Sequence, residues 1–322
     1  MEILSNDVQP YVGTPLVPVK GADPAPQKAF IILNPSSGKE KALDYARTAE
    51  LALLDKGYAV EIHETEGELD AARFSESACK QGCELIVCMG GDGTLNETIN
   101  GLMRHNRRPK LGVVPLGTVN DFARALGIPL EPEAAIAALA SEHTRAVDIG
   151  LLNDRLFSNV VAVGSMAEAL AGVTPEEKSR LGTLAYIKEG LKELVNGQSS
   201  PLRIKFDSGE WEGECPLFVA ALTNSVGGFE KLAPEAEVDD GLIHGFIFKD
   251  LGVLGTLTAG WSLWFGSLKE HKDVVYFTTR NLLIESSETV RTNIDGEPGP
   301  DLPASLRILP GQVRVVVPEA AQ

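Results

Sequence analysis

Short apolar runs alternate with helix-spaced apolar residues between residues 29 and 115, and this rhythm restricts the fold more than any other feature of the chain. The strand-like runs are Ala29–Leu33, Tyr58–His63, Leu85–Met89 and Leu111–Pro115. The helical patterns between them extend over about Leu43–Leu54, Leu69–Lys80 and Thr94–Met103. Strand and helix in this alternation predict a parallel sheet covered by helices on both faces, which is a three-layer α/β domain.

Two turn segments follow strands of this predicted sheet. Asn34–Gly38 comes after the first strand and Gly90–Gly93 after the third. Ligands of parallel α/β sheets bind beyond the carboxyl ends of the strands. We therefore expect both turns to lie at the ligand-binding edge.

The pattern changes near Asp148 to short apolar or alternating runs that turn residues separate. These runs are Leu156–Val163, Leu202–Phe206, Cys215–Thr223, Leu242–Phe248, Val274–Phe277, Asn281–Glu285, Ser305–Leu309 and Val313–Val317. They predict a β-rich domain built as an antiparallel sandwich or barrel, which two helical stretches interrupt at Tyr186–Val195 and Leu251–Phe265.

The chain is thus expected to have three parts. Residues 1–27 hold five prolines and form a leader, residues 28–147 the α/β domain, and residues 148–322 the β-rich domain. In this division the last residues of the chain are free to pack back on the first domain.

The charge balance restricts the partners of the chain. Lys and Arg number 29 and Asp and Glu number 45, which gives a formal net charge of −16. A chain with this negative charge is repelled by the phosphate backbones of nucleic acids. We therefore expect no nucleic-acid partner and no broad basic face that would bind anionic membranes. The four cysteines have no zinc-site spacing, and no secretory signal opens the chain, so we expect buried thiols and a cytoplasmic protein.

The segment Gly90–Glu97, GGDGTLNE, carries the strongest chemical signal. Glycines let a backbone approach phosphates, and the helix that follows offers free N–H groups to an anion. Asp92 suits this interpretation if a divalent cation lies between it and the phosphates, or if it accepts a bond from a sugar hydroxyl. The alternative is a capped helix with Asp92 or Thr94 as N-cap and Glu97 completing the capping box. Two consecutive glycines directly after a buried strand favour the phosphate interpretation.

Two acidic segments lie in the second half of the chain. In Asp295-Gly296-Glu297, residues two apart on an extended chain point the same way, so both carboxylates could face one cleft. The alternative is an ordinary acidic turn between strands. Asp239-Asp240-Gly241 is first of all a turn that precedes an apolar run.

Taken together, these segments resemble the diacylglycerol kinase catalytic domain superfamily, which is related to NAD kinases and sphingosine kinases. The resemblance is closest to its soluble bacterial lipid kinases, and it runs from Lys28 to the end of the chain. The matching segments are Asn34–Lys39 (NPSSGK), Gly90–Glu97, Pro115–Arg124 (PLGTVNDFAR), Asp148–Gly150, Gly182–Tyr186, Leu232–Ala236, Asp239–Gly241 and Asp295–Glu297. Each string is weak alone, but their occurrence in one order is specific.

The resemblance implies that ATP and Mg²⁺ are cofactors and that ATP lies between the α/β domain and a β-rich lipid-binding domain. The residues that it assigns to the nucleotide are Asn34, Lys39, Thr65, Gly91, Asp92, Gly93, Thr94, Leu95, Asn96, Glu97 and Thr118. It gives Glu297 the role of proton acceptor, with Asp295 as its acidic partner. It also implies a structural magnesium held by the Asp240 side chain and the carbonyl groups of Glu237 and Leu242.

The expected function is an ATP-dependent lipid kinase that phosphorylates a hydroxyl of diacylglycerol or a related lipid, in phospholipid biosynthesis. The expected partner is a lipid at the membrane surface, with transient membrane association. Trp261, Trp264 and Phe265 form either core or a lipid-entry face. The superfamily often forms homodimers, although nothing in the sequence locates an interface. One alternative is an NAD kinase, against which the LGTVNDFAR segment argues, and another is a non-catalytic nucleotide- or lipid-binding regulator.

Overall fold

A computed structural model describes residues 26–319 except 39–40, 165–198, 229–231 and 250–265. Six sequence predictions therefore lie outside the described residues. They are the leader up to residue 25, Lys39, the Gly182–Tyr186 segment, the helices at Tyr186–Val195 and Leu251–Phe265, and the aromatic group of Trp261, Trp264 and Phe265.

The first domain contains the predicted parallel sheet. Its strands have the order β2-β1-β3-β4. Their bounds are β1 Lys28–Leu33, β2 Ala59–Glu64, β3 Leu85–Gly90 and β4 Lys110–Pro115. Every residue of β3 is buried, as expected for a strand with helices on both faces.

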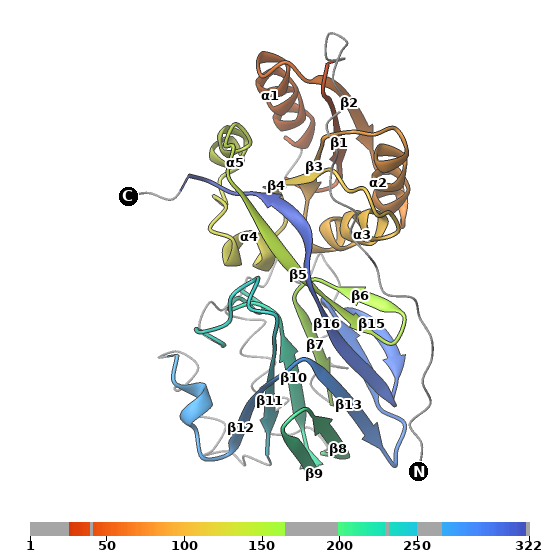
Figure 1. The fold of residues 1–322 in the computed structure, drawn as a ribbon, viewed down its shortest axis with the longest axis vertical. Helices are drawn as coiled ribbons and strands as arrows, with labels where there is room; N and C mark the ends of the chain where they lie inside the picture. Colours follow the sequence, from red (N-terminus) through yellow and green to blue (C-terminus); the bar gives the residue numbers. More distant parts are fainter. Residues whose placement is uncertain (1–25, 39–40, 165–198, 229–231, 250–265, 320–322) are drawn as a thin grey trace.

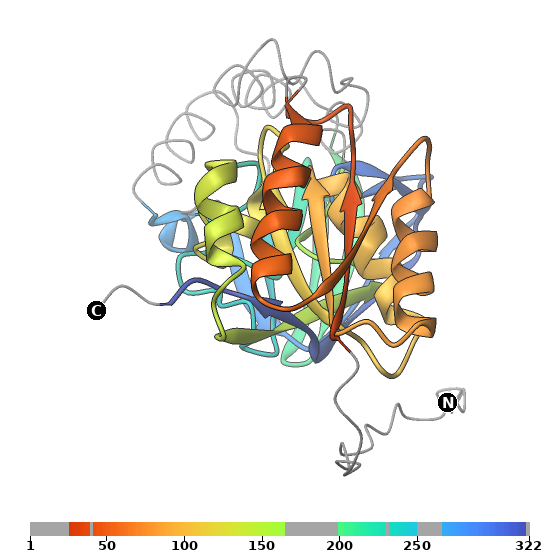
Figure 2. The ribbon, with the colours of Figure 1, turned by 90° about the horizontal axis from the view of Figure 1, so that it is seen from above.

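Helices cover both faces of this sheet. They are α1 Ala42–Asp55, α2 Asp70–Lys80, α3 Asp92–Met103, α4 Asp121–Ala125 and α5 Pro132–Ala138. α1 packs beside α5 on one face, and α2 packs beside α3 on the other (Figures 1 and 2). The short helices α4 and α5 were not expected from the sequence.

The topology of the sheet creates a binding crevice at its carboxyl edge. β1 and β3 are neighbours, but the chain leaves β1 through α1 toward β2 and leaves β3 through α3 toward β4, in the opposite direction. The two connections cover opposite faces, so a gap opens between the carboxyl ends of β1 and β3. Both predicted turns lie at this gap.

The sheet of the first domain continues into the second domain through one long strand, β16 (Ala304–Val316). Near its end β16 pairs in parallel with β4, and along its length it pairs antiparallel with β5 and β13. The other strands of this part are β5 Thr144–Leu152, β6 Arg155–Phe157, β8 Ser200–Phe206, β9 Gly209–Cys215 and β13 Asn281–Ser286. Ten strands therefore form one mixed sheet.

A second, antiparallel sheet faces this extension. Its order is β12-β11-β10-β7-β14-β15. The bounds are β7 Val160–Val163, β10 Leu217–Ala221, β11 Ile243–Phe248, β12 Val274–Thr279, β14 Arg291–Ile294 and β15 Glu297–Asp301, and the 3₁₀ helix η1 covers Leu268–Glu270. Phe218 and Ile247 from this sheet share a buried cluster with Ile284 and Leu306 from the other. The fold class predicted from the sequence, an α/β domain followed by a β-rich antiparallel sandwich, is confirmed.

Several boundaries differ from the predictions. The runs Ser305–Leu309 and Val313–Val317 belong to one strand, β16, in which the register shifts between Leu309 and Val313 around Gly311, whose φ is +62°. The run Leu156–Val163 is two strands, because Ser158 and Asn159 leave the ladder to bind a carboxylate described below.

Four strands had too weak a pattern to be expected, namely β5, β9, β14 and β15. β15 (EPGPD) contains two prolines, and within the described residues it is an edge strand that pairs only with β14. Among the described residues no helix is long and apolar enough to span a membrane. The four cysteines are buried and unpaired.

Candidate active site

Loops from neighbouring strands are tied together at the carboxyl edge of the first domain. Asn34, directly after β1, donates from Nδ2 to the hydroxyl of Thr94 in α3 at 3.1 Å. Its Oδ1 accepts the backbone N–H and the hydroxyl of Ser36, at 3.0 and 2.6 Å. The turn after β1 is thus fixed against the start of α3.

The amino end of α3 carries no side-chain cap. Gly91 is the N-cap residue, and among the described residues the helix start has no side-chain cap hydrogen bond. The Thr94 hydroxyl is directed to Asn34, so the capping box that the sequence left open is not formed. The first-turn N–H groups therefore remain for an anion.

Glycines are required here because two backbones pass close together. A Cβ added at Gly117 would lie 2.6 Å from Gly91 Cα, and one added at Gly90 would lie 2.6 Å from Thr94 Cβ. Real side chains do not make such contacts, so neither position accepts a larger residue without displacement. Gly117 was not among the predicted site residues, although it belongs to the LGT segment that supplied Thr118.

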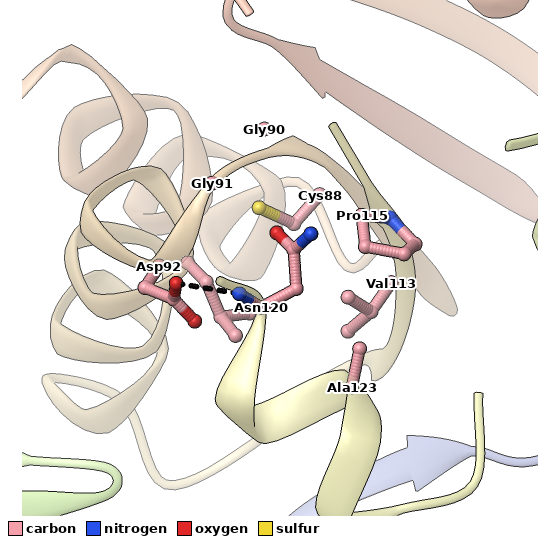
Figure 3. Close-up of a pocket in the computed structure, with 9 residues that line it drawn as sticks. Cys88, Gly90, Gly91, Asp92, Val113, Pro115, Asn120 and Ala123 are labelled. Carbon is pink, nitrogen blue, oxygen red and sulfur yellow. Dashed lines mark hydrogen bonds between the residues drawn. The ribbon is translucent and has the colours of Figure 1, made fainter. Parts of the chain in front are cut away.

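Asn120 fixes the loop after β4 to the glycine loop, Gly90–Gly93. Its backbone is left-handed (φ 56°), its Oδ1 accepts the Gly117 N–H at 3.1 Å, and its Nδ2 donates to the Gly117 carbonyl at 2.8 Å. Its own N–H donates to Asp92 Oδ2 at 2.9 Å. Figure 3 shows this contact at a narrow pocket below the loop. The pocket is lined by Cys88, Gly90, Gly91, Asp92, Leu95, Val113, Pro115, Asn120 and Ala123.

Asp92 lies in a region of concentrated negative charge. Burial, followed by the nearby carboxylates of Asp121 and Asp295, raises the pKa of Asp92 to about 6, against the opposing effect of the Asn120 N–H. A cation placed at this carboxylate would offset both the burial and the repulsion.

Asp121 is an anchor for a loop of the second domain. Its carboxylate accepts hydrogen bonds from the Ser225 hydroxyl at 2.7 Å and from the N–H groups of Gly227 and Gly228 at 2.7 and 2.8 Å. Burial raises its pKa. With both oxygens directed to these donors, Asp121 connects α4 to the segment after β10.

The acidic pair occupies a hairpin turn and not an extended chain. Asp295 and Gly296 have φ values of +49° and +90°, and Ile294 pairs with Glu297 across the turn that joins β14 to β15. Left-handed residues at both central positions are typical of a two-residue type I′ hairpin. The extended geometry that we assumed from the sequence is therefore wrong, and the two carboxylates need not point the same way.

The Asp295 carboxylate is fully engaged. Its Oδ2 accepts Asn96 Nδ2 and the Ser158 N–H, both at 2.7 Å, and the Ser158 hydroxyl at 3.1 Å. Its Oδ1 accepts the N–H groups of Asn159 at 3.0 Å and Val160 at 2.8 Å. Through these five hydrogen bonds the Asp295 side chain connects α3 to the second domain.

The Glu297 carboxylate is the one that reaches the glycine loop. It begins β15 and is exposed, and its Oε1 would lie 3.6 Å from a Cβ added at Gly93 in the first turn of α3. Partial burial raises its pKa, Arg155 opposes this shift, and the carboxylates of Glu97, Asp295 and Glu68 add to it. A residue of the second domain thus places a carboxylate beside the candidate phosphate site of the first.

The remaining predicted nucleotide residues lie at the same edge of the sheet. Thr65 follows β2, and its N–H donates to the Leu33 carbonyl at 2.8 Å. Thr118 is exposed in the turn that Asn120 holds, and Glu97 is half-buried in α3. Leu95 is buried, so its side chain contributes packing and not a polar contact.

The predicted structural magnesium does not fit the contacts of Asp240. Its Oδ1 accepts the Leu242 N–H at 2.8 Å, and its Oδ2 accepts the Glu237 N–H at 3.1 Å and pairs with His244 Nε2 at 2.9 Å. Burial raises the pKa of this carboxyl, but the His244 and Glu237 hydrogen bonds outweigh it and lower the net pKa. Three nitrogen donors thus already occupy the carboxylate oxygens that would have to bind the cation, so Asp240 is satisfied without a metal.

Neighbouring contacts strengthen the same loop. His244 is 3% exposed, and its Nδ1 lies 2.8 Å from the Tyr276 hydroxyl. Arg145 binds both Glu237 and Asp239, at 2.7 and 2.6 Å. Within the described part of the chain, no group of three His, Cys, Asp or Glu side chains is arranged to hold a metal ion.

Two family models match the chain. The diacylglycerol kinase catalytic domain matches residues 28–152, and the YegS C-terminal NAD kinase beta sandwich-like domain matches residues 159–317. Their boundary falls in the hairpin that leads from β5 to β7.

Known proteins match over nearly the whole chain. The diacylglycerol kinase of Staphylococcus haemolyticus is 37% identical over 296 residues, which is 90% of this chain and 88% of that protein. A Staphylococcus aureus diacylglycerol kinase is 37% identical over 297 residues, with 91% and 93% covered. The crystal structure of a diacylglycerol kinase from Bacillus anthracis has a TM-score of 0.77 at 25% identity and covers 91% of this chain and 98% of that one.

Proposed function

The chain belongs to the diacylglycerol kinase family, and from this membership we propose that it is an ATP-dependent lipid kinase acting on a hydroxyl of diacylglycerol or a related lipid. One observation carries the proposal. The Glu297 carboxylate of the β-rich domain lies against the uncapped glycine loop of the α/β domain. A proton acceptor and a phosphate site therefore meet where the two domains meet.

The α/β domain would bind the nucleotide. The first-turn N–H groups of α3 suit the phosphates, and Asn34 and Thr94 hold the neighbouring turn in place. Gly93, which has no side chain to obstruct the phosphate, separates this site from Glu297. Thr65 and Thr118 lie near enough along the sheet edge to contact the rest of the nucleotide.

Asp92 fits a magnesium ion that is bound mainly by phosphate oxygens. Mg²⁺ usually keeps several waters and takes one or two carboxylates together with the phosphates of its substrate, so a cage of three protein ligands is not required. Bound there, Mg²⁺ would neutralise charge on the transferring phosphoryl group. The burial of Asp92 beside the carboxylates of Asp121 and Asp295 supports a cation at this position.

Glu297 would orient the acceptor hydroxyl and take its proton. The hydroxyl oxygen attacks the γ-phosphorus of ATP, the bond from that phosphorus to the β,γ-bridging oxygen breaks, and ADP leaves. The transition state of phosphoryl transfer is loose, so the position of the carboxylate matters more than its basicity. Asp295, with its five hydrogen bonds, would hold the hairpin that carries Glu297.

The test is transfer of labelled γ-phosphate from MgATP to dispersed lipids and to NAD, with the wild type, Glu297→Gln and a matched control, Glu288→Gln. Glu288 is an exposed acid in the loop between β13 and β14. We expect label on a lipid with the wild type and the control and a loss of at least about a hundredfold with Glu297→Gln. Label on NAD alone would instead support the NAD kinase alternative. ATP binding without transfer would support the non-catalytic one.

A further inference from the structure

Asn293 has a buried amide nitrogen without a partner, two residues before the acidic hairpin turn. The side chain is 7% exposed, and its Nδ2 forms no hydrogen bond with the described residues. A buried donor left unpaired costs roughly 1–3 kcal/mol, so such groups are rare unless another molecule satisfies them.

The orientation of this amide is fixed by its other atom. Asn293 Oδ1 accepts the Gly296 N–H at 3.0 Å. Exchanging the oxygen and nitrogen of the amide would place a donor against that donor, so the unpaired atom is a nitrogen with its hydrogens. The need at this position is therefore for a hydrogen-bond acceptor.

The neighbours of Asn293 in the sheet supply no such acceptor. Asn293 lies opposite Ala162 on β7 and Pro298 on β15. Ala162, the β7 residue opposite Asn293, packs with Val219 on the outer face of the second sheet, away from the ten-stranded sheet. Ile294, the next residue along β14, belongs instead to the core between the two sheets. Within the described residues, neither ladder partner of Asn293 thus offers an acceptor to this donor, which lies beside the turn that presents Glu297.

We propose that Asn293 is a specificity-determining residue, whose Nδ2 donates to an oxygen of the acceptor lipid close to the hydroxyl that is phosphorylated. The inference rests on the proposed function. In a diacylglycerol, the ester carbonyl on the carbon next to the free hydroxymethyl group supplies such an oxygen. A sphingoid base carries an ammonium group next to its hydroxymethyl group, which would place donor against donor.

The test compares two lipids with the same free hydroxyl, a 1,2-diacylglycerol and the 1,2-dialkylglycerol of equal chain length, which lacks the carbonyl oxygens. We expect the wild type to favour the diacyl lipid in kcat/KM by about tenfold or more. Asn293→Asp keeps an acceptor for the Gly296 N–H but removes the donor, so it should lose this preference while its KM for MgATP is unchanged. Asn106→Asp, an exposed change between α3 and β4, is the control and should keep the preference.

The outcomes separate this inference from the function on which it rests. Equal use of both lipids by the wild type, or a preference retained in Asn293→Asp, overturns the role of Asn293 and leaves the lipid kinase intact. No transfer to either lipid overturns this inference and excludes diacylglycerol as the acceptor, while transfer to another dispersed lipid would still support the lipid kinase. Should Asn293→Asp melt well below the wild type, Asn293→Ser, which is smaller and uncharged, must show the same loss of preference.

Discussion

Replacing Asp295 with alanine should destabilise the protein far more than replacing Glu297. The carboxylate of Asp295 accepts five hydrogen bonds, and it joins Asn96 of α3 to the Ser158–Val160 segment. Ser158 and Asn159 are buried, so their N–H groups would be left without partners. At about 1–3 kcal/mol for each unsatisfied buried donor, after partial relaxation, the loss is about 3–5 kcal/mol.

The assay is thermal and urea unfolding of Asp295→Ala and Glu297→Gln beside the wild type. About 3–5 kcal/mol corresponds to a fall in Tm on the order of 4–8 °C for a protein of this size, whereas Glu297→Gln should stay within about 2 °C. Asp295→Asn, which keeps one acceptor oxygen, should fall between the two. A wild-type Tm for Asp295→Ala, with activity lost, would refute the anchoring role and favour direct participation in the chemistry.

Three further predictions concern the Asp92 carboxylate, the Asp240 carboxylate and the glycines of the candidate site. Because the pKa of Asp92 is raised to about 6, the folded state binds a proton more tightly than the unfolded one, so this group costs stability as pH rises from about 4 to 6. Asp92→Asn should therefore raise the Tm at pH 7.5 and raise it less at pH 5, while phosphate transfer is lost. An equal gain in Tm at both pH values would contradict this. Because His244 and backbone N–H groups satisfy the Asp240 carboxylate, EDTA should leave the Tm of the wild type unchanged, whereas His244→Phe should lower it. A fall in Tm with EDTA that Mg²⁺ reverses would show a structural cation instead. Gly117→Ala should lose about 1–3 kcal/mol of stability and bind ATP poorly, since its Cβ would meet the Gly91 backbone. Gly93→Ala should instead fold normally and lose turnover. Equal unfolding curves for Gly117→Ala and the wild type would refute the close approach of the two backbones.

The α/β domain could be predicted from sequence because its signals are local. About a dozen positions are enough to recognise a strand of buried residues such as β3, or a helix with apolar residues at regular spacing such as α1. The parallel order then follows from the alternation, and the glycine loops must lie at the carboxyl ends of the strands. The order of the short motifs added the family, which the matching domains and relatives confirmed.

Four strands and two short helices escaped prediction because their sequences lack such periodicity. The two prolines of β15 argue against a strand in isolation, and only its pairing with β14 makes it one. The joining of two apolar runs into β16 also depends on a partner, since β5 pairs on both sides of the register shift.

The sequence by itself determined the α/β layer, the β-rich second half and the position of the glycine loop, because hydrophobic periodicity and glycine spacing act over short distances along the chain. The tertiary structure alone decided the different positions and contacts of Asp295 and Glu297. Asn96 and Asp295 are 199 positions apart, and only their contact across the two domains turns Asp295 into an anchor and leaves Glu297 facing the loop. The nitrogen donors around Asp240 and the unpaired amide of Asn293 were equally invisible, because hydrogen-bond satisfaction depends on every neighbour that folding brings together.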